Sequence, residues 1–299
     1  MNSLIESKLN SFLEKHQLPS GFWRIITDHY LPLSHWIQQV KKPYPEIIGI
    51  SGAQGTGKST LADFLRITLE NEYNWVVATL SLDDFYLTQA ERKQLSKEVH
   101  PLLSTRGAPG THDLELCMRC LTELKALGNY QELALPKFDK AEDDRIPAHK
   151  WPKITGPIDA IILEGWCLGS QPQQPEQLTQ PVNDLEATRD GDAAWRTYVN
   201  DQLREKYSKL FQLVDHLVFL QAPDFEAVYR WRLEQETKLA RVTRKLSPGI
   251  MDEAQISEFL QHYERLTREN IELLPKIASV ILELDRNHQI TSTLYRQTI

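Results

Sequence analysis

One short stretch, residues 47–65, constrains the fold of this chain more than any other. It reads IIGISGAQGTGKSTLADFL and contains the pattern G-x-x-x-x-G-K-[ST], with an apolar run before it and a helical pattern after it. Glycines let such a loop curl so that its backbone N–H groups converge on phosphate oxygens, and the start of the following helix adds a favourable potential for an anion. The pattern in this strand–loop–helix context therefore predicts a nucleotide-binding P-loop. The predicted nucleotide-contacting residues are Gly52, Ala53, Gln54, Gly55, Thr56, Gly57, Lys58, Ser59 and Thr60.

Apolar segments that recur along the rest of the chain predict a sheet around this loop. The segment 158–165 shows no polar alternation, as expected for a strand with both faces buried. Amphipathic helical patterns separate the apolar segments, for example over 57–73 and 113–129. Such alternation predicts an α/β protein of the P-loop NTPase fold, with a mostly parallel sheet flanked by helices. The predicted strands are 46–51, 75–82, 158–165, 216–223 and 278–285.

The chain divides into two parts in this interpretation. Residues 1–45 show two amphipathic segments with a Pro-Ser-Gly break at 19–21, and we expect an N-terminal helical extension that packs on the core. Residues 46–299 then form one P-loop domain. Within it, the segment 169–192 is rich in Gln, Pro and Asp and has almost no large apolar residues, which predicts a surface excursion or a flexible loop.

Charge and composition argue against several classes of protein. The formal net charge is −7, so the basic face expected of a nucleic-acid-binding protein is not visible and we expect no nucleic-acid partner. The first 19 residues contain no apolar secretory segment, and no apolar run is long enough to cross a bilayer. Cys117 and Cys120 lie at helical spacing among leucines, which favours two reduced thiols over a metal or redox site. We therefore expect a cytoplasmic protein without a membrane partner, either a monomer or a small homo-oligomer.

Acidic residues at the ends of two predicted strands indicate what kind of molecule accepts the phosphoryl group. Asp83 and Asp84 end the second predicted strand, and Glu164 ends the third. In open α/β sheets ligands bind at this edge, where a carboxylate accepts the proton of an attacking hydroxyl or, together with Ser59, ligates Mg²⁺. The competing interpretation is that the two aspartates cap the next helix or lie in a solvated turn. The N-K-x-D and D-x-x-G patterns of switch GTPases do not occur in the chain, which favours an organic acceptor over water.

Five motifs occur together in the chain in a fixed order. They are G-A-Q-G-T-G-K-S-T, S-L-D-D-F-Y-L-T, R-G-A-P-G-T-H-D, P-K-F-D-K and I-L-E-G-W-C-L-G. With these motifs the chain resembles D-glycerate 3-kinase of plants and its fungal and bacterial relatives. That group belongs to the P-loop kinases, which also include uridine kinase, phosphoribulokinase and pantothenate kinase. The resemblance runs from about Ile47 to Asp285, is weakest in the N-terminal helices and in the segment 169–192, and implies ATP and Mg²⁺ as cofactors.

The resemblance also implies roles for individual residues. Asp83 is the implied general base, Lys58 the implied phosphate-binding cation, and Ser59, Asp83 and Glu164 the implied neighbours of Mg²⁺. The R-G-A-P-G-T-H-D loop closes over the acceptor in this family, and a guanidinium such as that of Arg106 suits a carboxylate because it can bind both oxygens. A solvated charged loop is the alternative. The implied acceptor-binding residues are Asp84, Tyr86, Arg106, His112, Asp139, Lys140 and Arg145.

A helical lid is implied at about 232–262. Small-molecule kinases of this class close such a lid over the phosphates, where its cations stabilise the charge on the transferring phosphoryl group and water is excluded. The implied catalytic cations are Arg241 and Arg244, and the sequence does not separate their roles. A solvated positive face is the competing interpretation.

The leading hypothesis is transfer of the γ-phosphoryl group of ATP to a hydroxyl of a small hydroxy acid, above all D-glycerate, which would give 3-phosphoglycerate. A second hypothesis keeps the kinase and makes the acceptor a nucleoside, pantothenate or a sugar phosphate. A third makes the chain an ATP-binding regulatory protein with slow ATPase activity. The guanidinium of the acceptor loop favours an acid modestly over a nucleoside, and acceptor-dependent release of ADP would separate the first two hypotheses from the third.

Overall fold

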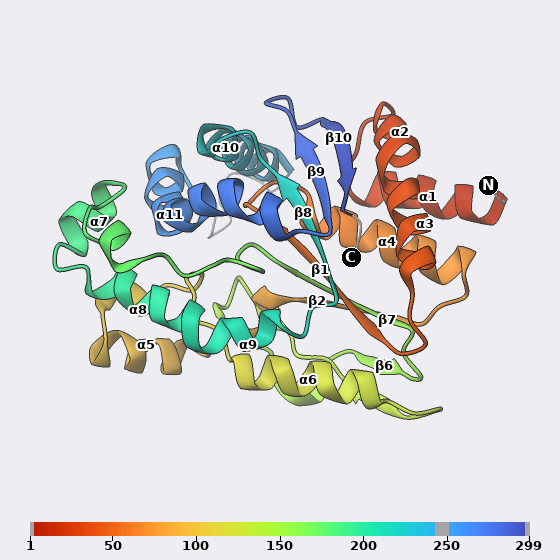
Figure 1. Cartoon of the computed structure of the whole chain (residues 1–299), viewed down its shortest axis with the longest axis horizontal. Coiled ribbons are helices and arrows are strands. Elements are labelled where there is room, and N and C mark those ends of the chain that lie inside the picture. Colours follow the sequence, from red (N-terminus) through yellow and green to blue (C-terminus); the bar gives the residue numbers. More distant parts are fainter. Residues whose placement is uncertain (1–2, 243–250, 297–299) are drawn as a thin grey trace.

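A six-stranded sheet forms the centre of the molecule. The computed structural model describes residues 3–242 and 251–296. The strand order is β10-β9-β8-β1-β7-β2, in which five adjacent strands run parallel and β10 pairs antiparallel with β9 at one edge (Figure 1). The predicted α/β fold with a mostly parallel sheet is confirmed. The strands are β1 (Glu46–Gly52), β2 (Val77–Ser81), β7 (Ala160–Gly165), β8 (His216–Gln221), β9 (Val280–Leu284) and β10 (Ile290–Tyr295).

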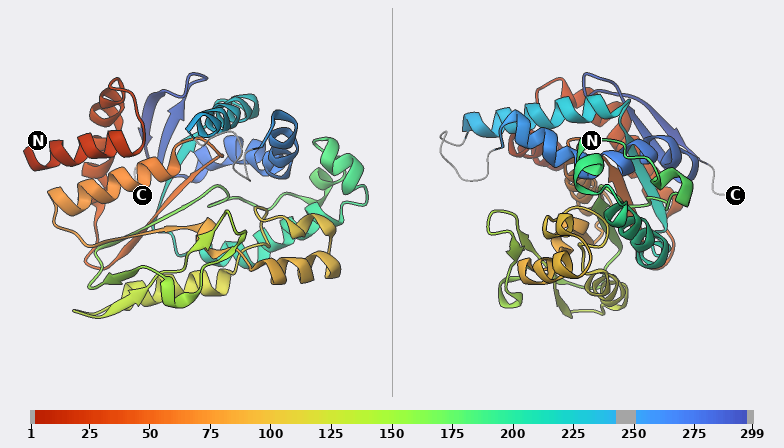
Figure 2. Two further views of the ribbon diagram at one scale, coloured as in Figure 1. Left: turned by 180° about the vertical axis from the view of Figure 1, so that it is seen from behind. Right: turned by 90° about the vertical axis from the view of Figure 1, so that its left-hand side faces the viewer.

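Helices cover both faces of this sheet. Successive side chains of a strand point to opposite faces, and in β1 this places Ile48 and Ile50 in one hydrophobic cluster and Ile47 in another. Figure 1 and Figure 2 show the two helix layers on either side of the strands. The first layer contains α1 (Ser3–Lys15), α2 (Phe22–Ile25), α3 (Leu31–Val40), α4 (Lys58–Glu72) and α10 (Phe225–Val242). The second contains α5 (Gln89–Glu98), α6 (Leu114–Ala126), α8 (Ala194–Gln202) and α9 (Ser208–Phe211), and α11 (Glu253–Ile277) packs on α10 and β8.

The N-terminal helices lie against the helix that follows the P-loop. Phe12 of α1 is buried and meets Phe64 of α4 edge-on, with 5.9 Å between the ring centroids. Lys15 forms an ion pair with Asp63 of α4 at 2.7 Å. Residues of α1, α3 and α4 thus share one hydrophobic cluster with the sheet.

The polar segment 169–192 lies on the surface and is more structured than its composition predicts. It contains a 3₁₀ turn, Pro175–Leu178, and the short helix α7 (Asp184–Arg189). Its two leucines, Leu178 and Leu185, are both buried. The fully buried Glu186 carboxylate pairs with Arg265 of α11 at 2.6 Å. The two leucines and this ion pair, together with hydrogen bonds such as those from Asn183 to Gln261 and Glu264 of α11, dock a segment that otherwise consists of polar residues.

Two short antiparallel strand pairs were not predicted from the sequence. One pairs β3 (Glu132–Ala134) with β6 (Lys153–Thr155), and the other pairs β4 (Phe138–Asp139) with β5 (Asp144–Arg145). Strands of two or three residues with charged side chains are too short to show an alternating pattern. In the described ranges, no helix combines the length and the apolar character needed to cross a membrane.

Candidate active site

Three parallel strands bring the predicted phosphate, metal and base residues to one edge of the sheet. In the register of the sheet, Glu164 of β7 lies opposite Ile50 of β1 on one side and Ser81 of β2 on the other. The P-loop follows β1 directly, and Asp83 follows β2 in the 3₁₀ turn η2 (Leu82–Phe85). Ligands of open α/β sheets bind at this carboxyl edge.

The P-loop has the geometry of a phosphate cradle. Gly55 and Gly57 have φ values of +81° and +96°, which side chains with a Cβ rarely adopt, and Gly57 is the N-cap of α4. Lys58 Nζ donates to the carbonyl of Ala53 at 2.9 Å and has no carboxylate partner within ion-pair distance in the part of the chain described. Burial lowers the pKa of Lys58, and the Glu164 carboxylate opposes this shift. A half-buried cation beside the backbone amides of the loop fits a phosphate group.

The oxygen atoms around Ser59 fit a magnesium ion. The Ser59 hydroxyl donates to Glu164 at 3.0 Å, so these two predicted ligands already lie side by side. Asp83 supplies a second carboxylate at the same edge of the sheet. Hydroxyl and carboxylate oxygens are the ligands that Mg²⁺ takes in nucleotide sites.

The two aspartates after β2 make different contacts. Asp83 accepts hydrogen bonds from the Tyr86 hydroxyl at 2.9 Å and from Lys140 Nζ at 2.7 Å. Burial alone would raise the pKa of Asp83, but the contacts of its carboxylate, led by the Lys140 ammonium and including the Tyr86 hydroxyl, together outweigh this effect and hold the pKa below its ordinary value. Asp84 instead binds Lys137 at 2.5 Å and the amide of Phe138, and so anchors the β4–β5 hairpin.

The alternative that these aspartates cap the next helix is not what the structure shows. The helix α5 begins with a capping box formed by Thr88 and Glu91. Asp83 is therefore available to the site, where it remains ionised at neutral pH. This contact pattern separates the two acids, a distinction that the sequence left open.

The acceptor loop 106–113 and the β4–β5 hairpin meet through ion pairs. Arg106 pairs with Asp143 and also donates to the carbonyl of Lys140 at 3.3 Å. Arg145 donates to the carbonyl of Tyr86 at 2.9 Å and to Asp113 at 3.2 Å. The two segments are thus joined before any acceptor binds.

His112 and Asp139 have their own partners in this region. The His112 ring stacks on Tyr86, with 4.4 Å between centroids and 22° between planes, and its Nδ1 lies 2.5 Å from the Tyr207 hydroxyl. Burial lowers the pKa of His112 to about 4, although Asp83 opposes the shift, so the ring is neutral at physiological pH. Asp139 accepts from the amides of Ala141 and Glu142 and stabilises the hairpin turn. The implied role of Asp139 in binding the acceptor stays a prediction.

Comparison with known proteins relates this site to a group of kinases. No family model matches the chain. The uncharacterized kinase mug58 of Schizosaccharomyces pombe is 37% identical over 235 residues, which cover 75% of this chain and 81% of the relative. The solved structure of D-glycerate 3-kinase from Cryptococcus neoformans superposes with a TM-score of 0.72 at 28% identity, over 89% of this chain and 96% of that one.

A plant enzyme is also similar. The chloroplastic D-glycerate 3-kinase of Arabidopsis thaliana is 31% identical over 229 residues, which cover 73% of this chain and 46% of the plant protein. The chain thus spans about half the length of that relative. This chain belongs to the P-loop kinase family of D-glycerate 3-kinase. It is a phosphotransferase whose acceptor is an alcohol group of a small molecule.

The predicted lid of this kinase is described only in part. Arg241 lies in the last turn of α10, where its side chain is not described, and Arg244 lies outside the described residues. The preceding part of α10 packs closely against the P-loop. A Cβ added to Gly55 would lie only 3.3 Å from the Cβ of Trp231. Farther along the helix, Arg232 pairs with the buried Glu236 at 2.7 Å. The catalytic roles of Arg241 and Arg244 stay predictions.

Three residues that shape the site of the kinase were missed from the sequence. Arg92 of α5 is fully buried and binds the carboxylate of Asp143 at 2.5 Å and the carbonyl of Leu87 at 2.7 Å. Asp143 in turn holds Arg106, and Tyr207 contacts His112. None of the three lies in a recognised motif, and Tyr207 is 95 residues from its partner in the sequence. No local sequence pattern predicts such long-range contacts.

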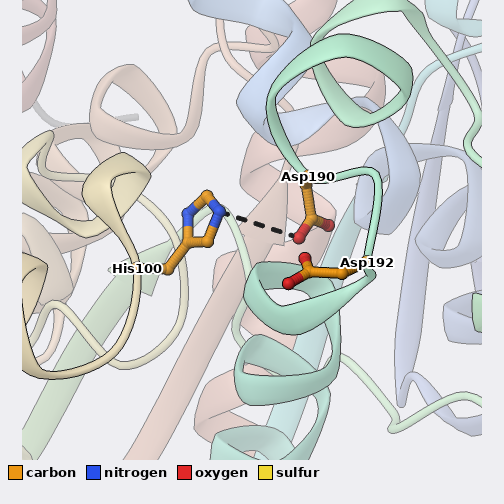
Figure 3. A group of neighbouring side chains, drawn as sticks. All are labelled: His100, Asp190 and Asp192. Atoms are coloured by element: carbon orange, nitrogen blue, oxygen red, sulfur yellow. Dashed lines mark ion pairs between the residues drawn. The ribbon is translucent and has the colours of Figure 1, made fainter.

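A cluster of His100, Asp190 and Asp192 lies apart from these motifs and has the composition of a metal site (Figure 3). Asp190 is fully buried and its carboxylate accepts from the Trp195 amide at 2.7 Å and pairs with Arg196 at 2.8 Å. His100 approaches the same carboxylate at 3.9 Å. Because a guanidinium already neutralises Asp190, the cluster is better explained as an anchor between the polar segment and α8.

Proposed function

We propose that this kinase transfers the γ-phosphoryl group of ATP to a hydroxyl of D-glycerate and forms 3-phosphoglycerate. The observation that carries the proposal is the setting of Asp83. Its carboxylate follows β2 at the same sheet edge as the P-loop, and it is held by Lys140 and Tyr86 instead of capping a helix. A carboxylate kept ionised at that position suits a hydroxyl nucleophile, whose proton it can accept.

The P-loop supplies the phosphate site in this proposal. Its backbone N–H groups and Lys58 would face the phosphates, and Lys58 would provide a positive charge that no carboxylate of the described residues neutralises at ion-pair distance. Ser59, Asp83 and Glu164 would hold Mg²⁺, which supplies charge neutralisation on the phosphate oxygens when bound. We further propose that Arg241 and Arg244 of the lid add cations that stabilise the transferring phosphoryl group.

The cations beside Asp83 support an anionic acceptor. Arg106 and Lys140 are each paired with one aspartate, and their side chains are 29% and 60% exposed. A guanidinium carries five N–H donors and an ammonium three, so both retain donors for a carboxylate. Because the aspartates already hold both side chains in place, the loss of side-chain entropy on binding is reduced. A hydroxy acid held by its carboxylate would present a hydroxyl to Asp83.

The protein itself then contributes mainly positioning and electrostatics. Phosphoryl transfer needs little covalent chemistry from side chains, so the alignment of the hydroxyl with the phosphate supplies much of the rate enhancement. Asp83 would accept the hydroxyl proton as the new O–P bond forms. Arg145 donates to the carbonyl of Tyr86 at 2.9 Å, and this hydrogen bond would hold the β4–β5 hairpin in a fixed position relative to Asp83.

A coupled assay of ADP release tests the proposal. The purified kinase is supplied with Mg²⁺ and ATP and with one of five compounds: D-glycerate, L-glycerate, pantothenate, uridine or ribulose 5-phosphate. We expect ADP release that depends on D-glycerate and is weaker with its enantiomer. If the kinase instead prefers pantothenate, uridine or the sugar phosphate, that compound and not D-glycerate would be the acceptor. ADP release that is indifferent to all five compounds would instead support a regulatory ATPase.

A further inference from the structure

The hydroxyl of Tyr207 contacts two residues of the acceptor loop 106–113 although Tyr207 lies far from this loop in the sequence. The side chain is fully buried. The amide of Gly110 donates to its oxygen at 3.0 Å, and the same oxygen lies 2.5 Å from Nδ1 of His112. Because an amide can only donate, and the described residues offer the hydroxyl no other acceptor, the Tyr207 O–H donates to Nδ1.

This contact fixes the tautomer of His112. A ring nitrogen that accepts a hydrogen bond carries no proton, so the neutral imidazole has its hydrogen on Nε2. Nε2 is buried and has no hydrogen-bond partner among the described residues. A buried donor without a partner costs free energy, and such groups in native proteins call for an explanation.

The surroundings of this N–H place it in the acceptor region. The ring of His112 stacks on Tyr86, whose hydroxyl donates to Asp83 at 2.9 Å. His112 is thus one aromatic ring away from the proposed base. An N–H donor at this place suits an oxygen of the acceptor, either a carboxylate or a hydroxyl oxygen.

The local backbone explains how Tyr207 reaches the loop. Residues Leu203–Tyr207 form a π-helical turn between α8 and α9, in which the amide of Ser208 donates to the carbonyl of Leu203. Such turns insert one residue into a helix, change which side chains face inward, and occur often at functional sites. Gly110 has a φ of +101°, and a Cβ there would lie 2.5 Å from a ring carbon of Tyr198. Glycine at position 110 therefore lets the loop 106–113 pack directly against α8.

We propose that Tyr207 is a positioning residue that holds His112 in its Nε2–H form, and that this N–H donates to an oxygen of the bound hydroxy acid. The inference rests on the proposed function, because the oxygen belongs to the acceptor. Since Nε2 is enclosed, the contact requires the loop 106–113 to shift when the acceptor binds. Tyr207 acts only through His112 and touches neither substrate.

Two replacements of His112 distinguish this role from a structural one. Glutamine places an amide N–H donor near the position of Nε2. Asparagine is shorter and instead places its amide oxygen near the position of Nδ1, where it can accept from the Tyr207 hydroxyl, but it leaves no donor near Nε2. We expect His112→Asn to lower kcat/KM for the acceptor by about tenfold to a hundredfold relative to His112→Gln, as for a lost hydrogen bond to a charged group. KM for ATP should stay unchanged in both variants. The opposite order of the two variants would overturn the proposal, because only the Nδ1 contact would then matter.

Nuclear magnetic resonance of the protein without substrates tests the tautomer independently of any activity. Two-bond ¹⁵N–¹H spectra distinguish protonated from unprotonated ring nitrogens, and the His112→Gln spectrum assigns the signals. We expect a proton on Nε2 in the native protein and a mixture of tautomers in Tyr207→Phe, which should also raise KM for the acceptor. Tyr198→Phe is the matched control, since its hydroxyl makes no hydrogen bond to the described residues. A proton on Nδ1 in the native protein would refute the inference whether or not glycerate is the acceptor.

Discussion

Replacement of Asp83 by asparagine separates a catalytic role from a structural one. Asparagine has nearly the same size and keeps an oxygen that can accept from the Tyr86 hydroxyl, which lies 2.9 Å from Asp83. It removes the negative charge that pairs with Lys140 at 2.7 Å. It also removes the group that would accept a proton from the attacking hydroxyl.

The two effects differ in size. The Lys140 side chain is 60% exposed, so loss of its ion pair should lower the free energy of unfolding by about 1 kcal/mol or less. A drop of that size lowers the melting temperature by only about 2–4 °C in a protein of this size class. Loss of a general base costs about 10²–10⁴ in rate, or roughly 2.7–5.4 kcal/mol of transition-state stabilisation. Turnover should therefore fall far more than stability.

The assay combines three measurements on the same preparation. We expect kcat from coupled ADP release to fall at least about a hundredfold, while ATP binding by calorimetry and the melting temperature stay close to those of the native protein. Glu132→Gln is the matched control, because Glu132 also pairs with a lysine, Lys153, at 2.9 Å, but both side chains are exposed and belong to the β3–β6 strand pair. Near-normal turnover of Asp83→Asn would refute the assignment of the base.

Four further predictions follow from the same geometry. Lys58→Ala should weaken ATP binding in equilibrium titrations as well as turnover, because it removes the cation of the cradle. Glu164→Gln should raise the Mg²⁺ concentration needed for half-maximal activity by about tenfold or more, since it removes the carboxylate charge beside Ser59 at the proposed Mg²⁺ site. Lys140→Met should shift the acid limb of the kcat/KM profile to higher pH, because the cation holds the pKa of Asp83 below its ordinary value and its loss lets the carboxylate protonate earlier as pH falls. Phe12→Ala should lower the free energy of unfolding in urea by about 3–5 kcal/mol, because the buried ring packs on α4; a change below about 1 kcal/mol would contradict this packing.

The sheet and the phosphate loop could be predicted from the sequence because their signals are local. The glycines of the P-loop are spaced for one backbone shape, and the buried strands β1 and β7 are continuous apolar runs. The end of each strand then fixes which residues meet at the sheet edge. For this reason Glu164 and Ser59, 105 residues apart, could be expected to meet, and they lie 3.0 Å apart.

The second layer of the site could not be predicted, because its contacts are long-range and made by ordinary residues. Arg92 appears in the sequence as one more charge on an amphipathic helix, yet it is fully buried under the β4–β5 hairpin. The different roles of Asp83 and Asp84 depend on which lysine of the hairpin each one meets. A strand of two residues such as β4 leaves no periodic signal. These contacts depend on the packed tertiary structure and on no local pattern.

The proposed reaction places the phosphate on the terminal hydroxyl of D-glycerate. ³¹P nuclear magnetic resonance of a reaction with ATP, Mg²⁺ and D-glycerate tests this proposal, because the product signal reports the carbon that carries the phosphate. We predict a phosphate ester coupled to the two protons of C3, together with one equivalent of ADP. A phosphate on C2, or ADP and free phosphate without any phosphoglycerate, would contradict the account.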